Sequence, residues 1–178
     1  MIKIEELNLK NLNKFYKYAN TFKGLEKKQL EFYPLLKPFP SSLSNLFSRF
    51  KKWKKKEYIF LVCFINLNIV GHAMVKNLYK NYSKSTNKKL KFPSTGIYVQ
   101  KKYRKHKIGS LMMNLIIMIC KFRKIKKIYA TVSETNIASK KLHKKVGYKK
   151  TSVFFKRRYK LNKNKFYNFK DFQYINDL

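Results

Sequence analysis

The stretch from Val99 to Ser110 constrains the fold of this chain more than any other part of its sequence. An extended run from Thr95 to Val99 leads into it, and an apolar run from Ile108 to Phe122 follows. The apolar run is too long for a strand and contains no proline, so we predict a helix. Gly109 and Ser110 therefore lie at a helix start, where unpaired N–H groups and the helix dipole favour a bound phosphate. A glycine there would also let the anion come close.

Two blocks of sequence lie on either side of this predicted helix. In the first, Val99 is followed at fixed spacing by Arg104 and Gly109, which resembles the acetyl-CoA loop V-x-x-x-x-[Q/R]-x-x-G-x-[G/A] of the GNAT N-acetyltransferases. The second block, 132–148, is similar to the asparagine-to-glycine motif of the same family. The clear resemblance covers about residues 58–160.

The resemblance implies a fold class and a domain organisation. The whole chain, 1–178, would form a single α/β domain of the GNAT type, with a mixed, mostly antiparallel sheet flanked by helices. Two positions depart from the family pattern. Lys107 replaces the first glycine of the loop, and His143 stands where the family usually has tyrosine.

Periodicity and turn residues predict the elements of this domain. We expect strands near 2–7, 58–65, 69–78, 91–99, 126–132 and 148–155, with a final hairpin over 156–174. We expect helices over 11–19, 43–53, 108–122 and 136–145, the first burying Leu12, Phe15, Tyr16 and Ala19. Gly24 is a predicted break, three prolines exclude a helix interior at 32–40, and 79–89 is predicted to be a loop or an extension of a hairpin.

The resemblance implies acetyl-CoA as the cosubstrate and assigns the residues that would contact it. These are Ile97, Tyr98, Val99, Arg104, Lys105, His106, Lys107, Ile108, Gly109, Ser110, Asn136 and Ser139. The Val99 N–H would polarise the thioester and stabilise its oxyanion by a few kcal/mol. Lys107 would supply its own N–H to the phosphates if its backbone keeps a negative φ.

Few side chains are available for proton transfer. His143 is the candidate acid for the coenzyme thiolate, with helix packing as the alternative interpretation. Glu134 is the only carboxylate between residues 58 and 170, and it is either a catalytic base or a solvated loop residue. His72 would either reach the acceptor cleft or be a structural histidine, in the core or on the surface. A water relay needs no side chain. The three histidines and two cysteines match no metal-ligand spacing, so we predict no metal.

The charge balance is strongly basic, at +35 from 43 Lys and Arg against 8 Asp and Glu. Such a field favours anionic partners. Arginine is scarce, however, and a dedicated nucleic-acid surface would favour it, so we expect no specific nucleic-acid binding and attribute much of the charge to compositional drift. No apolar run is long enough to span a membrane. Cys63 and Cys120 lie in apolar runs, which favours buried thiols in a cytoplasmic protein.

We therefore predict an acetyl-CoA-dependent N-acetyltransferase that acts on a primary amine of a small or nucleotide-linked metabolite. One alternative keeps the reaction and changes the acceptor to a protein N-terminus or lysine. Another is a catalytically inactive, basic GNAT-like module that binds RNA or the ribosome. The sequence leaves the acceptor and the existence of a homodimer open.

Overall fold

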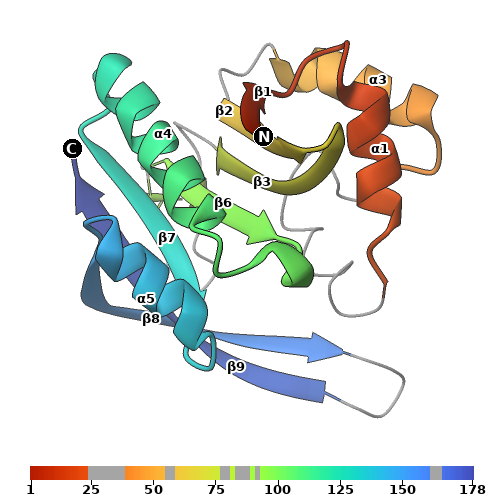
Figure 1. Cartoon of the computed structure of the whole chain (residues 1–178). Coiled ribbons are helices and arrows are strands. Elements are labelled where there is room, and N and C mark those ends of the chain that lie inside the picture. The colour runs from red at the N-terminus through yellow and green to blue at the C-terminus, as the bar shows by residue number, and fades with distance from the viewer. Residues whose placement is uncertain (24–38, 55–58, 77–80, 83–88, 91–92, 161–165) are drawn as a thin grey trace.

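A seven-stranded sheet runs through the molecule, and helices cover both of its faces (Figure 1). The computed structural model describes residues 1–23, 39–54, 59–76, 81–82, 89–90, 93–160 and 166–178. The predicted break at Gly24, most of the proline-rich segment 32–40 and of the polar segment 79–89, and the turn of the last hairpin lie outside the described residues.

The sheet contains strands from both ends of the chain, in the order β1-β2-β3-β6-β7-β9-β8. Its strands are β1 (Ile2–Glu6), β2 (Ile59–Ile65), β3 (Asn68–Lys76), β6 (Ser94–Val99), β7 (Lys127–Ser133), β8 (Lys149–Lys160) and β9 (Phe166–Asp177). A separate short pair consists of β4 (Asn81–Tyr82) and β5 (Lys89–Leu90). Only β6 and β7 pair in parallel within the described part of the sheet, which confirms the predicted mixed, mostly antiparallel class.

The helices form a layer on each face. They are α1 (Leu12–Asn20), α3 (Leu43–Lys54), α4 (Ile108–Phe122) and α5 (Ile137–Lys145), with a 3-10 turn η2 (Lys101–Tyr103) before α4. Figure 1 shows α1 and α3 on one side of the sheet and α4 and α5 on the other. None of the helices in the described ranges combines the length and the apolar character needed to cross a membrane.

Alternation along the strands gives each face its own core. Phe60 and Val62 of β2 point toward α1 and α3, where they meet Phe15 and Phe50. Their neighbours in β2 point the other way and pack against α4 and β7. The predicted apolar face of α1 needs one correction, because Tyr18 is buried in the core whereas Tyr16 is only partly buried at its edge. The helix turns Tyr18 toward the middle of the sheet, where its hydroxyl lies 3.1 Å from Nδ1 of the buried His72.

The C-terminal strands correct a second prediction. Instead of a strand at 148–155 and a separate hairpin, β8 continues to Lys160 and pairs with β9 along its length. A register shift between Lys150 and Phe154 lets the long strand bend without ending. β9 lies between β7 and β8, so the last strand of the chain is the one that joins the hairpin to the sheet.

The predicted helix limits around α5 are confirmed in atomic detail. The side chain of Asn136 accepts a hydrogen bond from the Ser139 N–H at 3.0 Å, which caps the first turn. Gly147 ends the helix with a φ of +91°, a left-handed conformation that glycine adopts without a steric penalty. A serine caps α3 in the same way, since Ser42 Oγ accepts from the Asn45 N–H at 3.1 Å.

Candidate active site

The parallel strands β6 and β7 separate shortly after they meet. Among the described residues, their paired register covers Ser94 with Tyr129 and Thr95 with Ala130. Beyond Thr95, β6 stays with β3 while β7 pairs with β9, and the two strands diverge in Figure 1. The result is a fork in the middle of the sheet, open at the end where the basic loop begins.

The alternation of the backbone decides which groups of β6 face this fork. The Gln100 N–H, just after β6, donates to the Val70 carbonyl of β3 at 2.9 Å. Even-numbered residues of β6 therefore direct their N–H groups toward β3, and odd-numbered residues direct them the other way. Ile97 and Val99 thus present their N–H groups to the open side of the fork. This is the edge at which an extended ligand can add itself as a strand.

Buried hydroxyl groups close the base of the fork. Thr95 Oγ1 donates to the Tyr129 carbonyl at 3.0 Å and lies 3.0 Å from the hydroxyl of Tyr148. Because the Thr95 hydroxyl donates its proton to the Tyr129 carbonyl, it accepts a hydrogen bond from the Tyr148 hydroxyl. Burial raises the pKa of Tyr148 far above its ordinary value, so the phenol stays neutral. The sequence indicated Tyr148 only as a motif residue, and its partner Thr95 was missed because the two are far apart along the chain.

The basic loop is tied to the end of β6. Arg104 donates from Nε to the Val99 carbonyl at 3.0 Å, and its guanidinium carbon lies 5.7 Å from the centre of the Tyr98 ring. The ring nitrogen Nδ1 of His106 lies 2.9 Å from the Arg104 carbonyl oxygen. Arg104 is exposed and therefore does two things at once: it fixes the strand end, and it places cationic N–H groups at the mouth of the fork.

The backbone of Lys107 does not have the negative φ that the sequence-based assignment to the phosphates required. Lys107 has a φ of +60° rather than a negative value, and Lys105 is also left-handed at +68°. Lys107 is the residue just before α4, and its carbonyl accepts from the Leu111 N–H at 3.0 Å. The fold thus keeps the left-handed turn that a glycine would favour and forces a lysine into it, at a cost of about 1–2 kcal/mol.

Gly109 has a packing role that the sequence did not indicate. A Cβ atom at this position would lie 3.3 Å from Leu142 of α5 and 3.8 Å from Ile97 of β6. The space beside Gly109 is therefore filled by apolar side chains rather than left for a phosphate. The glycine lets α4, α5 and β6 approach one another, which positions the start of α4 at the fork.

His143 is buried near the base of the fork. Its ring lies edge-on to that of Tyr148, with 5.0 Å between the ring centroids, and its Nδ1 lies 2.8 Å from the Ser139 carbonyl oxygen. Burial lowers the pKa of His143, an effect that the bond to Ser139 opposes, so the imidazole is neutral at pH 7. Nδ1–H is then the donor to Ser139. Nε2 keeps a lone pair, and among the described residues it has no hydrogen-bond partner.

The remaining predicted residues lie along the other arm of the fork. Glu134 follows β7 in an exposed turn, and its N–H donates to the Lys170 carbonyl at 2.7 Å. Asn136 and Ser139 come next, at the start of α5, with Asn136 exposed and Ser139 partly buried. The structure therefore brings the second sequence block to the arm opposite the loop that contains Arg104.

His72 lies on the opposite face of the sheet and is completely buried. Its Nδ1 is 3.1 Å from the Tyr18 hydroxyl, and its ring stacks on Tyr98 at 5.8 Å between centroids. Burial lowers the pKa of His72 to about 3. Of the two interpretations left open by the sequence, the structure supports the core histidine. His72 supports Tyr98 from behind, on the α1 side of β6.

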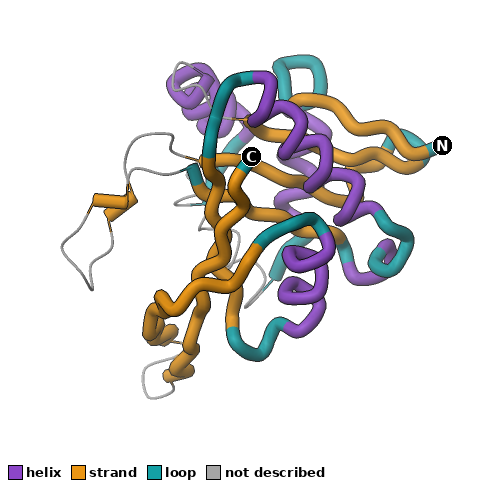
Figure 2. Tube along the Cα trace, turned by 90° about the vertical axis from the view of Figure 1, so that its left-hand side faces the viewer, coloured by secondary structure: helices purple, strands orange, loops and turns teal. Residues whose placement is uncertain are grey.

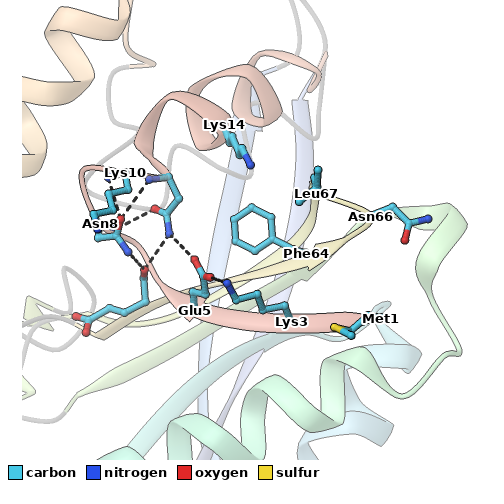
Figure 3. Close-up of a pocket in the computed structure, with 11 residues that line it drawn as sticks. Met1, Lys3, Glu5, Asn8, Lys10, Lys14, Phe64, Asn66 and Leu67 are labelled. Carbon is cyan, nitrogen blue, oxygen red and sulfur yellow. Dashed lines mark hydrogen bonds and ion pairs between the residues drawn. The ribbon is translucent and has the colours of Figure 1, made fainter.

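A cavity of about 580 Å³ lies elsewhere, at the β1 edge of the sheet (Figure 3). It is bordered by the start of α1 and the β2–β3 turn, with Phe64 and Lys14 among its lining residues. Its polar groups are already engaged with one another: Glu5 pairs with Lys3 and accepts from Asn11. Two strands, β2 and β3, separate this edge from the fork, so we do not assign it to the same site. No cluster among the described His, Cys, Asp and Glu residues could hold a metal.

The fork, the N–H groups that β6 directs away from β3, and the basic loop at a helix start are typical of a class of α/β protein that binds a long phosphate-bearing ligand between two parting strands. The chain belongs to the GNAT family of acetyltransferases, whose family model matches residues 22–148. Acetyl-CoA is the cosubstrate of that family.

Solved structures share the whole fold at low sequence identity. An N-acetyltransferase from Staphylococcus aureus has a TM-score of 0.71 at 17% identity, covering 99% of this chain and 98% of that one. A ribosomal-protein-alanine N-acetyltransferase from Brucella melitensis has a TM-score of 0.70 at 15% identity, covering 99% of each. A phosphinothricin acetyltransferase from Sinorhizobium meliloti, solved with acetyl-CoA, has a TM-score of 0.67 at 13% identity, covering 99% and 88%. None of the curated proteins matches this sequence.

Proposed function

We propose that this protein transfers the acetyl group of acetyl-CoA to a primary amine on a small or nucleotide-linked metabolite. The observation that carries the proposal is the fork, in which β6 turns the N–H groups of Ile97 and Val99 away from β3 and toward the gap. In the reaction the amine nitrogen bonds to the thioester carbonyl carbon, the carbon–sulfur bond breaks, and the amine loses a proton as the thiolate leaves.

The proposed coenzyme contacts fall on both arms of the fork. On the β6 arm, the N–H of Val99 would stabilise the oxyanion, and the loop and first turn from Arg104 to Ser110 would hold the pyrophosphate. On the other arm, Asn136 and Ser139 are the proposed contacts. Nearly all loop side chains are exposed and basic, which supports the assignment to a polyanionic ligand.

Proton transfer remains a proposal with two candidates. His143 as an acid would first have to gain a proton, because its burial favours the neutral ring. The free lone pair on Nε2 is better suited to accepting a proton or a hydrogen bond. Glu134, at the exposed end of β7, is the candidate base, acting through water. An amine that arrives neutral needs neither residue.

The alternative acceptor is a protein N-terminus. The neighbour from Brucella melitensis is described as a ribosomal-protein-alanine N-acetyltransferase, and the two folds extend over nearly the full length of both chains. The TM-score of 0.70 shows a shared fold, but at 15% identity the acceptor does not carry over. It has to be found by screening amines of both kinds while following thiol release. The two free, buried thiols of Cys63 and Cys120 support a cytoplasmic site of action.

Two arginines at opposite ends of α4 give a matched test of the proposed coenzyme site. Arg104, before the helix, and Arg123, after it, are both exposed. Arg104→Ala removes a charged donor from the mouth of the fork, so acetyl-CoA affinity measured by calorimetry should fall about 10- to 100-fold. Arg123→Ala removes the same charge from the far end and should leave the affinity within about twofold of the wild type.

Equal affinities of the two folded variants would contradict the proposed position of the phosphates. Absence of acetyl-CoA binding by the wild type would contradict the function itself and favour the inactive, basic module. Thiol release with any amine acceptor, lost in Arg104→Ala at limiting acetyl-CoA, is the positive result.

A further inference from the structure

The outer side of α4 carries a row of largely exposed apolar side chains, of which the partly buried Leu115 also packs against the second core. Leu111, Met118 and Phe122 have exposed fractions of 49%, 64% and 89%. With the partly buried Leu115, they recur every three or four residues and so lie on one face of the helix. We call these four residues the α4 ridge. It extends for about 16 Å along the helix axis.

The opposite side of α4 is already occupied. Met112, Met113, Ile116 and Cys120 point into the second core and are fully buried. The helix is therefore apolar on both its inner and its outer side. Such helices are normally covered all round, and an apolar ridge of this length exceeds the scattered single residues expected on a surface. Figures 1 and 2 show α4 on the outside of the sheet, where a further partner can reach it.

The charges around the ridge indicate the sign of that partner. From residue 101 to residue 133 the sequence contains no aspartate or glutamate. Exposed cations gather where the ridge ends, at Lys121, Arg123, Lys124 and Lys126, and outnumber the nearby Asp177, which pairs with Lys127 at 3.3 Å. An anionic surface would neutralise them, whereas a second copy of this chain, with a net charge of +35, would place like charges against them.

We propose that the α4 ridge docks the protein on an acidic lipid surface. A convex row of side chains can enter the lipid interface without a shaped groove on the other side. The cations of the whole chain are mostly lysines, which act through their field rather than through bidentate contacts, as attraction to a charged lipid surface requires. The most exposed residues, Met118 and Phe122, lie at the far end of α4 from the loop, so docking leaves the fork accessible.

Flotation with lipid vesicles tests the proposal. The wild type should bind vesicles of equal parts phosphatidylglycerol and phosphatidylcholine, and bind phosphatidylcholine vesicles far more weakly. The double variant Met118→Gln/Phe122→Gln keeps every charge and removes the two most exposed apolar groups. In high salt, where simple charge attraction is screened, its partitioning onto the acidic vesicles should be at least about 100-fold weaker than that of the wild type.

The control variant is Leu67→Asn, which removes an exposed apolar side chain, 78% exposed, from the β2–β3 turn. It should partition like the wild type. Equal partitioning of the wild type and the ridge variant would overturn the proposal and reduce the binding to unspecific charge attraction. A wild-type dimer in sedimentation velocity that the ridge variant dissociates would overturn it in favour of a second copy. The ridge variant should bind acetyl-CoA as the wild type does, which separates this test from that of the proposed function.

Discussion

The left-handed backbone of Lys107 leads to a prediction that the structure makes quantitative. At a φ of +60° the lysine Cβ is crowded by its own backbone, at a cost of about 1–2 kcal/mol. Glycine avoids this cost but loses about 0.5–1 kcal/mol of additional backbone entropy on folding. The midpoints of these two ranges differ by about 0.75 kcal/mol, so Lys107→Gly should raise the free energy of unfolding by about that amount. For a domain of this size that is an increase in Tm of about 1–4 °C.

The matched variant is Lys107→Ala, which removes the same ammonium group but keeps a Cβ atom. Thermal and urea unfolding of the two variants, at one pH and salt concentration, isolates the backbone contribution from the charge. Lys107→Gly should be the more stable of the two. Acetyl-CoA affinity should change equally in both, because each loses one exposed cation beside the proposed phosphate site. Equal stabilities of the two variants would refute the argument from backbone strain.

Three further predictions concern buried contacts. Thr95→Val leaves the buried Tyr148 hydroxyl without its partner at 3.0 Å and should lower the free energy of unfolding by about 1–3 kcal/mol; adding Tyr148→Phe should restore part of the loss in a double-mutant cycle. Burial lowers the pKa of His72 to about 3, so at acidic pH the unfolded chain binds more protons than the folded chain. The contribution of His72 to stability is therefore complete above about pH 6.5 and is lost as the pH decreases toward 3. In a pH series of urea unfolding curves, the free energy of unfolding of His72→Phe should depend less on pH than that of the wild type. Gly71→Ala would place a Cβ atom 2.9 Å from the Tyr98 carbonyl oxygen. The free energy of unfolding, measured with urea, should therefore fall by about 1–3 kcal/mol. An unchanged stability would show that β3 and β6 separate easily.

Local signals in the sequence were sufficient to predict most of the helices and strands. The apolar run of α4, the asparagine cap of α5 and the glycine that ends it each depend on residues only a few positions apart, so the sequence alone predicts them. The apolar runs at 58–65 and 69–78 likewise predicted strands, and the structure buries both faces of β2 and β3. The extent of β8 was not predicted, because its continuation past residue 155 depends on pairing with β9, a partner that follows a turn.

The candidate site shows the same division. The sequence identified the loop from Arg104 to Ser110 and the block beginning at Asn136, because both are contiguous motifs. Whether the two face each other depends on where β6 and β7 part, and that is a property of the sheet. The hydrogen bond between Thr95 and Tyr148 joins positions 53 residues apart, and no local sequence pattern predicts it.

The sequence thus determined which reactive groups this chain contains, and the tertiary structure determined their positions and protonation states. The sequence alone specified a basic loop at a helix start, three histidines, and Glu134 as the only carboxylate between residues 58 and 170. Only the packed structure showed that His72 and His143 are buried and neutral, that Gly109 accommodates Leu142, and that Lys107 is held left-handed. The reason is physical: pKa, strain and packing depend on neighbours in space, and those neighbours come from distant parts of the chain.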